Sequence, residues 1–377
     1  MHVREQVSLA SLTTLGIGGP AAVLLDLTDP DDLPDVAAFA VAHGTHPLVL
    51  GGGSNVLVAD SGCSAPVIKV ATEGIRFQSD PEGTVLVTVE AGHSLQDLVD
   101  AAIVEGLTGM ETLTGIPGTV GATPVQNVGA YGQEVADTLV SVEAWDWVRR
   151  RAVSLSAGQC RLGHRTSIFK HSHRWLLLRV VFRLRPSALS TPITYRQVAD
   201  ALGIPPGARV PLADAAAGVL AVRRGKGMVL TPGDLDNRNA GSIFLSPVVP
   251  PRAAERLRVQ DAPVHDFSDG STRVSASWLI KEAGFALGQR LAEGVRLSTK
   301  QYTLVADRGA TAAAFAAAVE TIMGAVYTTA GVQLAPEPDL FGDEPTYRRL
   351  TEKGLSRLLE PSSVYLTRVS WPLPCRE

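Results

Sequence analysis

Hydrogen-bonding side chains alternate with glycines and prolines between residues 115 and 132, and these residue types at this spacing could bind a polar ligand. The hydrogen-bonding groups belong to Thr119, Thr123, Gln126, Asn127 and Tyr131. The residues that control the backbone are Gly115, Pro117, Gly118, Gly121, Pro124, Gly129 and Gly132. Glycine lets a ligand approach the backbone closely, whereas proline restricts φ. The composition favours a shaped loop around a flat ligand with phosphates, although a long glycine-rich connection between two packed layers would look the same.

A second glycine-rich turn, Gly51-Gly52-Gly53-Ser54-Asn55, follows the apolar residues 47–50. The Rossmann fingerprint requires a helix after its glycines, but residues 56–60 read as another short strand. We therefore expect a tight strand-to-strand turn whose free amides could hold a pyrophosphate. A plain hairpin turn explains the pattern equally well.

Length and composition limit the possible function classes. A chain of 377 residues exceeds what one hydrophobic core usually serves, so two or three domains are expected. A net charge of −4 gives no basic surplus for nucleic acid, and a small-molecule partner is expected instead. We find no apolar run near twenty residues and no signal peptide, and so expect a cytoplasmic protein without a membrane partner.

The three cysteines, Cys63, Cys160 and Cys375, are far apart and form no CxxC pair. This spacing supports neither a disulfide framework nor a zinc site. We therefore expect no metal, and we expect these cysteines to act as small apolar or exposed residues rather than as nucleophiles.

Hydrophobic periodicity predicts the elements that must position these loops. The predicted strands span residues 21–25, 47–50, 56–60, 67–70, 85–89, 138–147, 175–184 and 304–306. The predicted helices span residues 31–43, 95–105, 212–224, 277–283 and 311–330. A region rich in proline and glycine from 186 to 210 precedes a candidate domain boundary at about 205–215.

Six motifs in this order resemble the UDP-N-acetylenolpyruvoylglucosamine reductase family, and the resemblance covers about residues 8–342. The motifs are Thr14–Gly19, Leu50–Asn55, the 115–132 loop, Arg165–Lys170, Asn239–Ser242 and Pro336-Glu337. The resemblance implies an α+β fold, in which a two-part FAD-binding module of the vanillyl-alcohol-oxidase type precedes an α+β substrate-binding domain. It assigns residues 1–70 to the first FAD-binding subdomain, 71–210 with 331–345 to the second, 211–330 to the substrate-binding domain and 346–377 to a tail.

The implied activity is reduction of the enolpyruvyl ether of UDP-N-acetylglucosamine to UDP-N-acetylmuramate, a cytoplasmic step of peptidoglycan precursor synthesis. NADPH would reduce a non-covalently bound FAD, which would then pass a hydride to the enolpyruvyl methylene carbon. We expect a monomer. Two alternatives stay open: a paralogous FAD-dependent oxidoreductase acting on a related nucleotide sugar in a specialised pathway, and a catalytically silent flavin- or nucleotide-sugar-binding protein.

The resemblance also implies a role for individual residues. Arg165 would hold the substrate carboxylate, Glu337 would lie beside the enol oxygen, and Ser242 would donate a proton to carbon. Retention of all three argues against the silent binding protein. The implied cofactor-binding residues are Gly51, Gly52, Gly53, Ser54, Asn55, Gly115, Ile116, Pro117, Gly118, Gly121, Ala122, Gln126, Asn127, Gly129 and Ala130. The implied substrate-binding residues are Tyr131, Tyr195 and Lys226.

Some positions depart from the family pattern. Leu245 and Ser246 stand where the family commonly has a lysine and an asparagine, and Gln301 stands where a histidine often follows Leu-Ser-Thr-Lys. Ser246 is shorter than asparagine and has no amide, which is why a modified nucleotide sugar stays a candidate substrate. Ser54-Asn55 occupy the position at which covalent-flavin oxidases of the superfamily typically carry a histidine, and this disfavours that branch.

Overall fold

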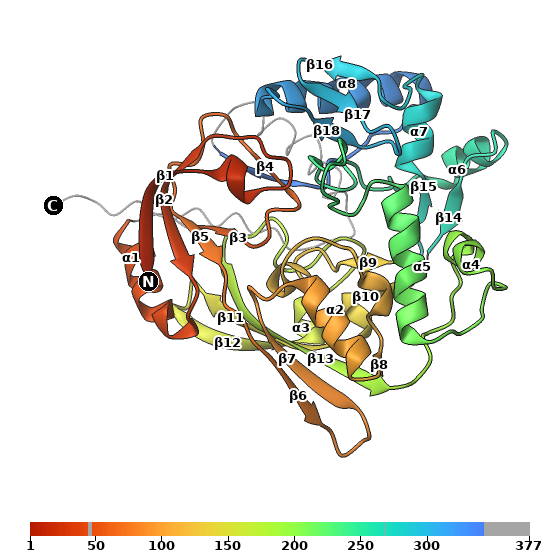
Figure 1. The fold of residues 1–377 in the computed structure, drawn as a ribbon. Helices are drawn as coiled ribbons and strands as arrows, with labels where there is room; N and C mark the ends of the chain where they lie inside the picture. Colours follow the sequence, from red (N-terminus) through yellow and green to blue (C-terminus); the bar gives the residue numbers. More distant parts are fainter. Residues whose placement is uncertain (44–46, 268, 343–377) are drawn as a thin grey trace.

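The computed structural model describes residues 1–43, 47–267 and 269–342, and Figure 1 shows how their elements are arranged. The N-terminal part is a four-stranded sheet in the order β1-β2-β5-β3. Its strands are β1 (His2–Ser8), β2 (Pro20–Leu27), β5 (Val67–Val70) and β3 (Leu48–Leu50). Helix α1 (Leu33–Ala42) buries Val36, Ala37 and Ala40 in the same core as Leu25 and Leu27 of β2. The apolar residues whose spacing predicted this helix are therefore those that pack against the sheet.

The chain that follows β3 does not form a hairpin. Strand β4 (Val56–Val58) pairs in parallel with β19 (Asp339–Phe341), whereas β3 pairs in parallel with β5. The hairpin interpretation of residues 51–55 is therefore wrong, because the partner of β4 comes from the far end of the described chain. The turn instead carries the backbone from one sheet to another.

The middle of the chain forms a six-stranded antiparallel sheet in the order β12-β11-β13-β7-β6, with β8 pairing the end of β13. Its strands are β6 (Ile75–Ser79), β7 (Val85–Glu90), β8 (Leu107–Thr108), β11 (Leu139–Asp146), β12 (Arg151–Ser156) and β13 (Trp175–Pro186). Helix α2 (Leu95–Val104) packs its apolar side into one core with Val87, Val89 and Val180. The 115–132 loop contains only a 3-10 turn, η4 (Val120–Ala122), and the two-residue strand β9 (Gly129–Ala130).

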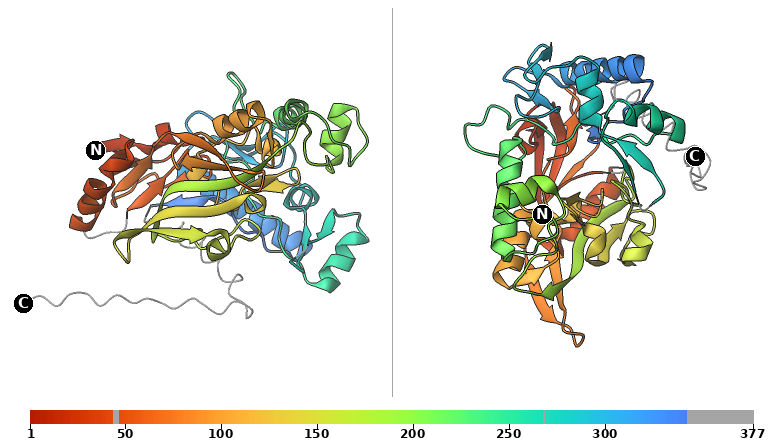
Figure 2. Two further views of the ribbon diagram at one scale, coloured as in Figure 1. Left: turned by 90° about the horizontal axis from the view of Figure 1, so that it is seen from below. Right: turned by 90° about the vertical axis from the view of Figure 1, so that its right-hand side faces the viewer.

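The C-terminal part contains the three-stranded sheet β16-β17-β18 and the hairpin β14-β15. Its elements are α6 (Pro251–Arg258), β14 (Val264–Asp266), β15 (Thr272–Val274), α7 (Ala276–Glu282), β16 (Arg290–Ala292), β17 (Val295–Leu297), β18 (Leu304–Ala306) and α8 (Ala312–Ala330). Helices α4 (Arg196–Leu202) and α5 (Leu212–Gly225) connect it to the central sheet. In Figure 2 the N-terminal sheet and the β14-β15 hairpin lie at opposite ends of the molecule.

The core of the C-terminal part includes residues from the start of the chain. Leu15, Ile17, Leu57 and Ala59 are buried in the same cluster as the side chains of α7 and α8. The domain boundaries given above stay a prediction, and the tail from 346 to 377 lies outside the described residues.

Within the described ranges, α8 is the one helix whose length and composition would suit a membrane span. The sequence analysis did not identify it as a run of that kind. Eight of its 19 residues are buried, and they pack in the C-terminal core. This packing is that of a core helix of a globular domain.

We expect Asp60→Ala to destabilise the protein, because Asp60 caps α8 from a distant part of the chain. Its carboxylate accepts from the amides of Ala312 (2.8 Å) and Ala313 (2.9 Å). Loss of such a cap costs about 1–2 kcal/mol, which lowers the melting temperature by about 1–3 °C in a protein of this length. Thermal unfolding should rank Asp60→Asn between the wild type and Asp60→Ala, and an unchanged melting temperature for Asp60→Ala would contradict the capping role.

Candidate active site

Two adjoining cavities lie where the N-terminal sheet, the 115–132 loop and the C-terminal part meet. The larger has a volume of about 510 Å³ and the smaller about 420 Å³. Gly51, Thr119 and Ala122 line both, so the two spaces share a wall. A bipartite ligand with one polar and one apolar end suits such a pair of cavities.

The 51–55 turn and the 115–132 loop touch through their backbones. A Cβ atom added to Gly52 would lie 2.6 Å from the Cα of Gly118, so there is no room for a side chain at position 52 between the loops. The Ser54 hydroxyl donates to the Pro117 carbonyl at 2.9 Å, and the Lys69 ammonium donates to the Gly51 carbonyl. The two predicted loops therefore form a single backbone cradle.

Residues 337–339 close the cradle from the other end of the chain. The Asn55 amide donates to Gln126 Oε1 at 2.6 Å, and its backbone carbonyl accepts from the Asp339 amide at 3.0 Å. The Glu337 amide in turn donates to the Ile243 carbonyl at 2.8 Å, one residue beyond Ser242. One short segment thus contacts both the cofactor turn and the serine loop.

Arg165, Ser242 and Glu337 line the larger cavity together, although they come from three distant parts of the chain. The Arg165 guanidinium donates to the carbonyls of Asn127 (3.0 Å) and Gly129 (2.7 Å), and its Nε lies 3.7 Å from Glu337 Oε1. The loop carbonyls therefore fix the direction in which this cation points.

Burial raises the pKa of Glu337, and the nearby Asp339 raises it further, whereas Arg165 and Lys170 act in the opposite direction. The carboxyl side chain is only 13% exposed. Lys170 forms an ion pair with Asp339 at 3.0 Å and donates to the Glu337 carbonyl at 3.1 Å. The protonated form of Glu337, which can donate a hydrogen bond, therefore persists to higher pH than in water.

Ser242 lies in a loop without regular secondary structure and is exposed to the cavity. Gly241 before it has a φ of +71°, which a residue with a side chain rarely adopts. The Thr303 hydroxyl donates to the Gly241 carbonyl. Contacts from several elements, rather than a helix or a strand, hold this serine in place.

The far end of the larger cavity is aromatic and basic. The rings of Tyr131 and Tyr195 are 5.7 Å apart and nearly perpendicular, and the Lys226 ammonium lies 5.7 Å from the Tyr131 ring. Burial, followed by the charge of Arg223, lowers the pKa of Lys226. The three predicted substrate-binding residues therefore share one wall, and its cations favour an anionic ligand.

Arg223 is a cavity residue that the sequence analysis missed. It is 8% exposed, donates to the carbonyls of Gly115 and Met228 at 3.1 Å, and has a buried Nε without a hydrogen-bond partner among the described residues. Burial lowers its pKa. Its position three residues before Lys226, on the last turn of α5, was the available signal, because such residues share a helix face.

His164 is a second residue that was missed. It lines the larger cavity, and its ring lies 5.6 Å from that of Phe267 in the C-terminal part. Burial, with the charges of Arg273 and Arg165, lowers its pKa to about 4. The imidazole is therefore neutral at pH 7.

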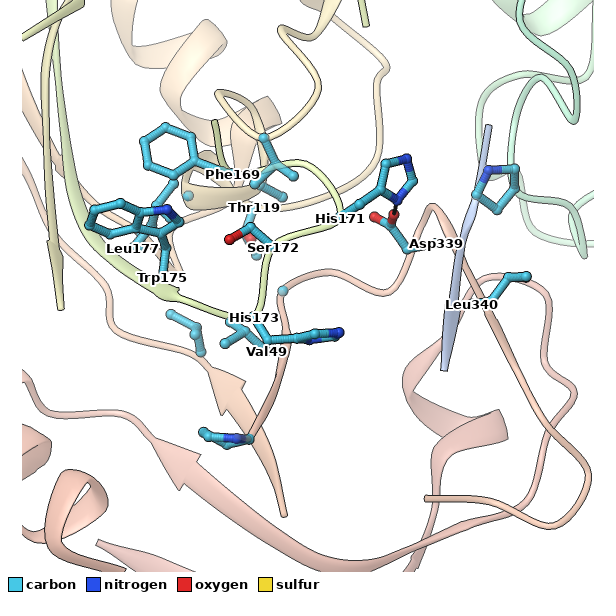
Figure 3. A pocket seen from close by; sticks show the side chains of 18 of the residues that line it. Val49, Thr119, Phe169, His171, Ser172, His173, Trp175, Leu177, Asp339 and Leu340 are labelled. Carbon is cyan, nitrogen blue, oxygen red and sulfur yellow. Dashed lines mark ion pairs between the residues drawn. The ribbon is translucent and has the colours of Figure 1, made fainter. Parts of the chain in front are cut away.

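The smaller cavity is mainly apolar, and Figure 3 shows its labelled side chains. Phe169, Trp175, Leu177 and Val49 line it, and His171 Nδ1 lies 3.2 Å from Asp339 Oδ1 at its edge. None of these side chains was predicted as a site residue, although Phe169 belongs to the Arg165–Lys170 motif. Flat apolar walls beside a hydrogen-bonding edge suit an aromatic ring system.

The predicted cofactor residues divide into two groups. Those that line the larger cavity are Gly51, Gly52, Gly53, Ser54, Asn55, Ile116, Pro117, Gly118, Ala122, Gln126, Gly129 and Ala130. Gly121 lines the smaller cavity, whereas Gly115 and Asn127 lie behind the lining. The Asn127 side chain is buried and donates to the Gly163 carbonyl at 3.0 Å. Its contact supports the loop from behind.

The departures from the family pattern differ in their distance from the site. Leu245 and Ser246 line the larger cavity, and Leu245 also lines the smaller one. Gln301 lines neither, and its Nε2 is buried without a hydrogen-bond partner among the described residues. Only the first two positions can therefore contact a ligand directly.

The residues present fit FAD. The 51–55 turn and residues 116–119 line the same cavity with backbone and small side chains, and the two adjoining cavities match the two ends of the cofactor. The 51–55 turn and the 116–119 segment would hold the diphosphate, because their amides can bind anionic oxygens without a lysine.

We expect Gly52→Ala to weaken FAD binding by about 10- to 100-fold, since overpacking a tight contact costs about 1–3 kcal/mol. The added methyl group would push the 51–55 turn away from Gly118. Flavin fluorescence titration measures the affinity. Gly324→Ala is the matched control, because Gly324 lies in α8 and an added methyl group there would meet no atom within 4 Å. Equal affinities for both variants would contradict the close-contact cradle.

Comparison with known proteins matches the chain to two domain families. Residues 20–148 match the FAD binding domain family, and residues 233–341 match the C-terminal domain of UDP-N-acetylenolpyruvoylglucosamine reductase. The enzyme of that name from Saccharopolyspora erythraea is 44% identical over 346 residues, covering 88% of this chain and 94% of the relative. The one from Thermobifida fusca is 42% identical over 348 residues, covering 90% and 98%.

A solved structure supports the fold. UDP-N-acetylenolpyruvylglucosamine reductase from Thermus caldophilus superimposes with a TM-score of 0.61 at 26% identity, covering 90% of this chain and 100% of that one. The predicted fold class and the prediction of an FAD-dependent oxidoreductase are confirmed. The chain belongs to the UDP-N-acetylenolpyruvoylglucosamine reductase family.

Proposed function

We propose that this protein reduces the enolpyruvyl ether of UDP-N-acetylglucosamine to UDP-N-acetylmuramate in peptidoglycan precursor synthesis. The observation that carries the proposal is the meeting of Arg165, Ser242 and Glu337 at the wall of one cavity, beside the glycine cradle. The names of the relatives support the same substrate. Anaerobic addition of UDP-N-acetylenolpyruvoylglucosamine to the reduced holoenzyme tests it, and flavin that stays reduced would refute it.

Arg165 binds the substrate carboxylate and stabilises the negative charge that develops beside it. FAD, when bound, supplies the hydride that the reduction requires. Two loop carbonyls hold the guanidinium, so it needs little reorganisation when charge appears. The side chain is 27% exposed, which leaves part of it available to a ligand.

Glu337 and Ser242 act on the other atoms of the enolpyruvyl group. Glu337, whose pKa burial raises, donates a hydrogen bond to the enol oxygen in its protonated form. Ser242 donates a proton to carbon, which completes the reduction. A serine is a weak acid, so its hydroxyl must be held close to a strongly basic carbon, and the surrounding contacts of its loop suit that requirement.

The UDP part binds at the aromatic and basic end of the larger cavity. Tyr131 and Tyr195 offer rings for stacking or hydroxyls for hydrogen bonds, and Lys226 offers charge to a diphosphate. Burial beside Arg223 makes this lysine costly to keep charged without an anion. An anionic ligand therefore offsets an electrostatic cost already present in the protein.

We also make proposals for the reductant, the cellular location and the oligomeric state. We propose NADPH as the reductant, the cytoplasm as the location and a monomer as the functional form. Anaerobic titration of the holoenzyme with NADPH and with NADH tests the first, and light scattering after size-exclusion chromatography tests the third.

A related nucleotide sugar is the second candidate substrate. The observation that favours it is the position of Leu245 and Ser246 on the cavity wall, where both depart from the family pattern. Comparing reoxidation rates for the standard enolpyruvyl sugar and for variants altered in the sugar or the base separates the two. A higher kcat/KM for an altered sugar would favour the paralogue.

We expect Ser242→Ala to leave flavin reduction by NADPH within about twofold of the wild type. Reoxidation by the enolpyruvyl sugar should slow by about 10²–10⁴-fold, because the proton donor to carbon is lost. Stopped-flow absorbance measures both steps separately. Ser11→Ala, which alters an exposed serine bonded to the Ser8 carbonyl, is the control. Equal loss in both steps would argue against a proton-donor role.

We expect the rate of reoxidation to fall as the pH rises through the raised pKa of Glu337. The sign follows from the role, because the protonated carboxyl donates the hydrogen bond and a raised pKa extends that form upward in pH. Glu337→Gln keeps a donor that does not titrate, so this part of the pH profile should flatten. A rate that increases over the same range in the wild type would contradict the assignment.

A further inference from the structure

The turn from Thr13 to Gly19 has no role in the function described so far, although it belongs to the first of the six motifs. It connects η1 (Leu9–Leu12) to β2 and lies directly against the cofactor turn. The Thr14 amide donates to the Gly53 carbonyl at 3.0 Å. A Cβ atom on Gly53 would overlap the Leu12 carbonyl oxygen, so the two turns are in close contact.

The opposite side of the same turn contacts the loop that carries the serine. The Thr14 hydroxyl donates to the Asn239 carbonyl at 2.6 Å. The Arg238 guanidinium donates to the carbonyls of Leu15 (3.2 Å) and Gly16 (2.7 Å). Three hydrogen bonds therefore join this turn to Arg238 and Asn239, where the serine loop begins.

Asn239 links Thr14 to the backbone next to Ser242. It is 7% exposed, and its side-chain oxygen accepts from the Gly241 amide at 2.8 Å. Its side-chain amide donates to the Asp236 carbonyl at 2.5 Å. The residue is thus held at its carbonyl by Thr14 and at its side chain by its own loop, two residues before the glycine that precedes the serine.

Apolar packing fixes the same connection. Leu15 and Ile17 are buried in one cluster with Ala240, Ile243 and Phe244, which flank Ser242 in the chain. Since the serine loop has no regular secondary structure, these contacts determine where the hydroxyl lies. A displacement of about 1 Å in a reacting group can cost about 10²-fold in rate.

We infer that Thr14 is a positioning residue that couples the cofactor turn to the proton-donating serine. Its amide contacts Gly53 and its hydroxyl contacts Asn239, so this one residue bonds directly to both the cofactor turn and the loop of Ser242. The inference rests on the proposed function of Ser242. Thr14 does not touch the reacting atoms. It acts through its hydrogen bonds to the backbone carbonyls of Gly53 and Asn239.

The test compares Thr14→Val with Thr14→Ser in the FAD-loaded enzyme. Valine keeps the shape and loses the hydroxyl, while the amide contact to Gly53 is unchanged. We expect reoxidation by UDP-N-acetylenolpyruvoylglucosamine to slow by about 10- to 100-fold. The FAD content and the rate of reduction by NADPH should stay within about threefold of the wild-type values. Thr14→Ser should restore the rate of reoxidation to within about threefold of the wild type.

Two further variants separate positioning from general stability. Thr321→Val removes a hydroxyl that donates to the Ala317 carbonyl at 2.9 Å within α8, and we expect both half-reactions to be unchanged. Arg238→Met removes the neighbouring bonds to the same turn and should also slow reoxidation selectively. This second variant decides the question if Thr14→Val does not fold.

The outcomes are distinguishable. Wild-type flavin that the enolpyruvyl sugar does not reoxidise would overturn the proposed function and the role of Thr14 with it. Normal reoxidation in the wild type, with Thr14→Val unchanged or equally slow in both half-reactions, would overturn the inference alone. Selective slowing with rescue by serine would establish it.

Discussion

The structure depends most on the short segment from Ala335 to Phe341, which forms backbone hydrogen bonds on both sides. On one side β19 pairs with β4, and the Asp339 amide donates to the Asn55 carbonyl. On the other side the Glu337 amide donates to Ile243, and the Leu245 amide donates to Ala335. Because an extended backbone offers donors and acceptors along both edges, one strand can hold the cofactor turn and the serine loop together.

The charges around this segment explain why the site needs a ligand. Glu337 is mostly buried, with its pKa raised, beside the Arg165 guanidinium, and Lys170 is only 7% exposed beside Asp339. Burying ions costs more than isolated pairs usually return. At the far end, Arg223 and Lys226 have lowered pKa values for the same reason. An anionic substrate supplies partners for these cations. Pairing relieves the unfavourable electrostatic free energy of the free protein, and this favours substrate binding in one orientation.

Close backbone contact gives this arrangement its geometry. Gly52 lies against Gly118, and Gly53 lies against Leu12, so three loops from different parts of the sequence are in contact without intervening side chains. Loops usually vary in position more than helices and strands do. Here the hydrogen bonds of Ser54 and Thr14 replace regular secondary structure in fixing them. The site residues consequently lie on loops, and close backbone contacts and hydrogen bonds hold these loops in position.

The two glycine loops, the long periodic elements such as α2 and α8, and the motifs carrying Arg165, Ser242 and Glu337 were all predictable from sequence. These are local properties, because backbone freedom and apolar spacing are set by neighbouring residues. Three features could be seen only in the folded chain. Strand β4 pairs with β19 rather than with β3, α4 and the short strands β16 and β17 form, and Arg223 and His164 line the cavity. Strand pairing and the burial of cations depend on contacts between residues far apart in the chain. A local sequence pattern does not predict which distant residue makes such a contact.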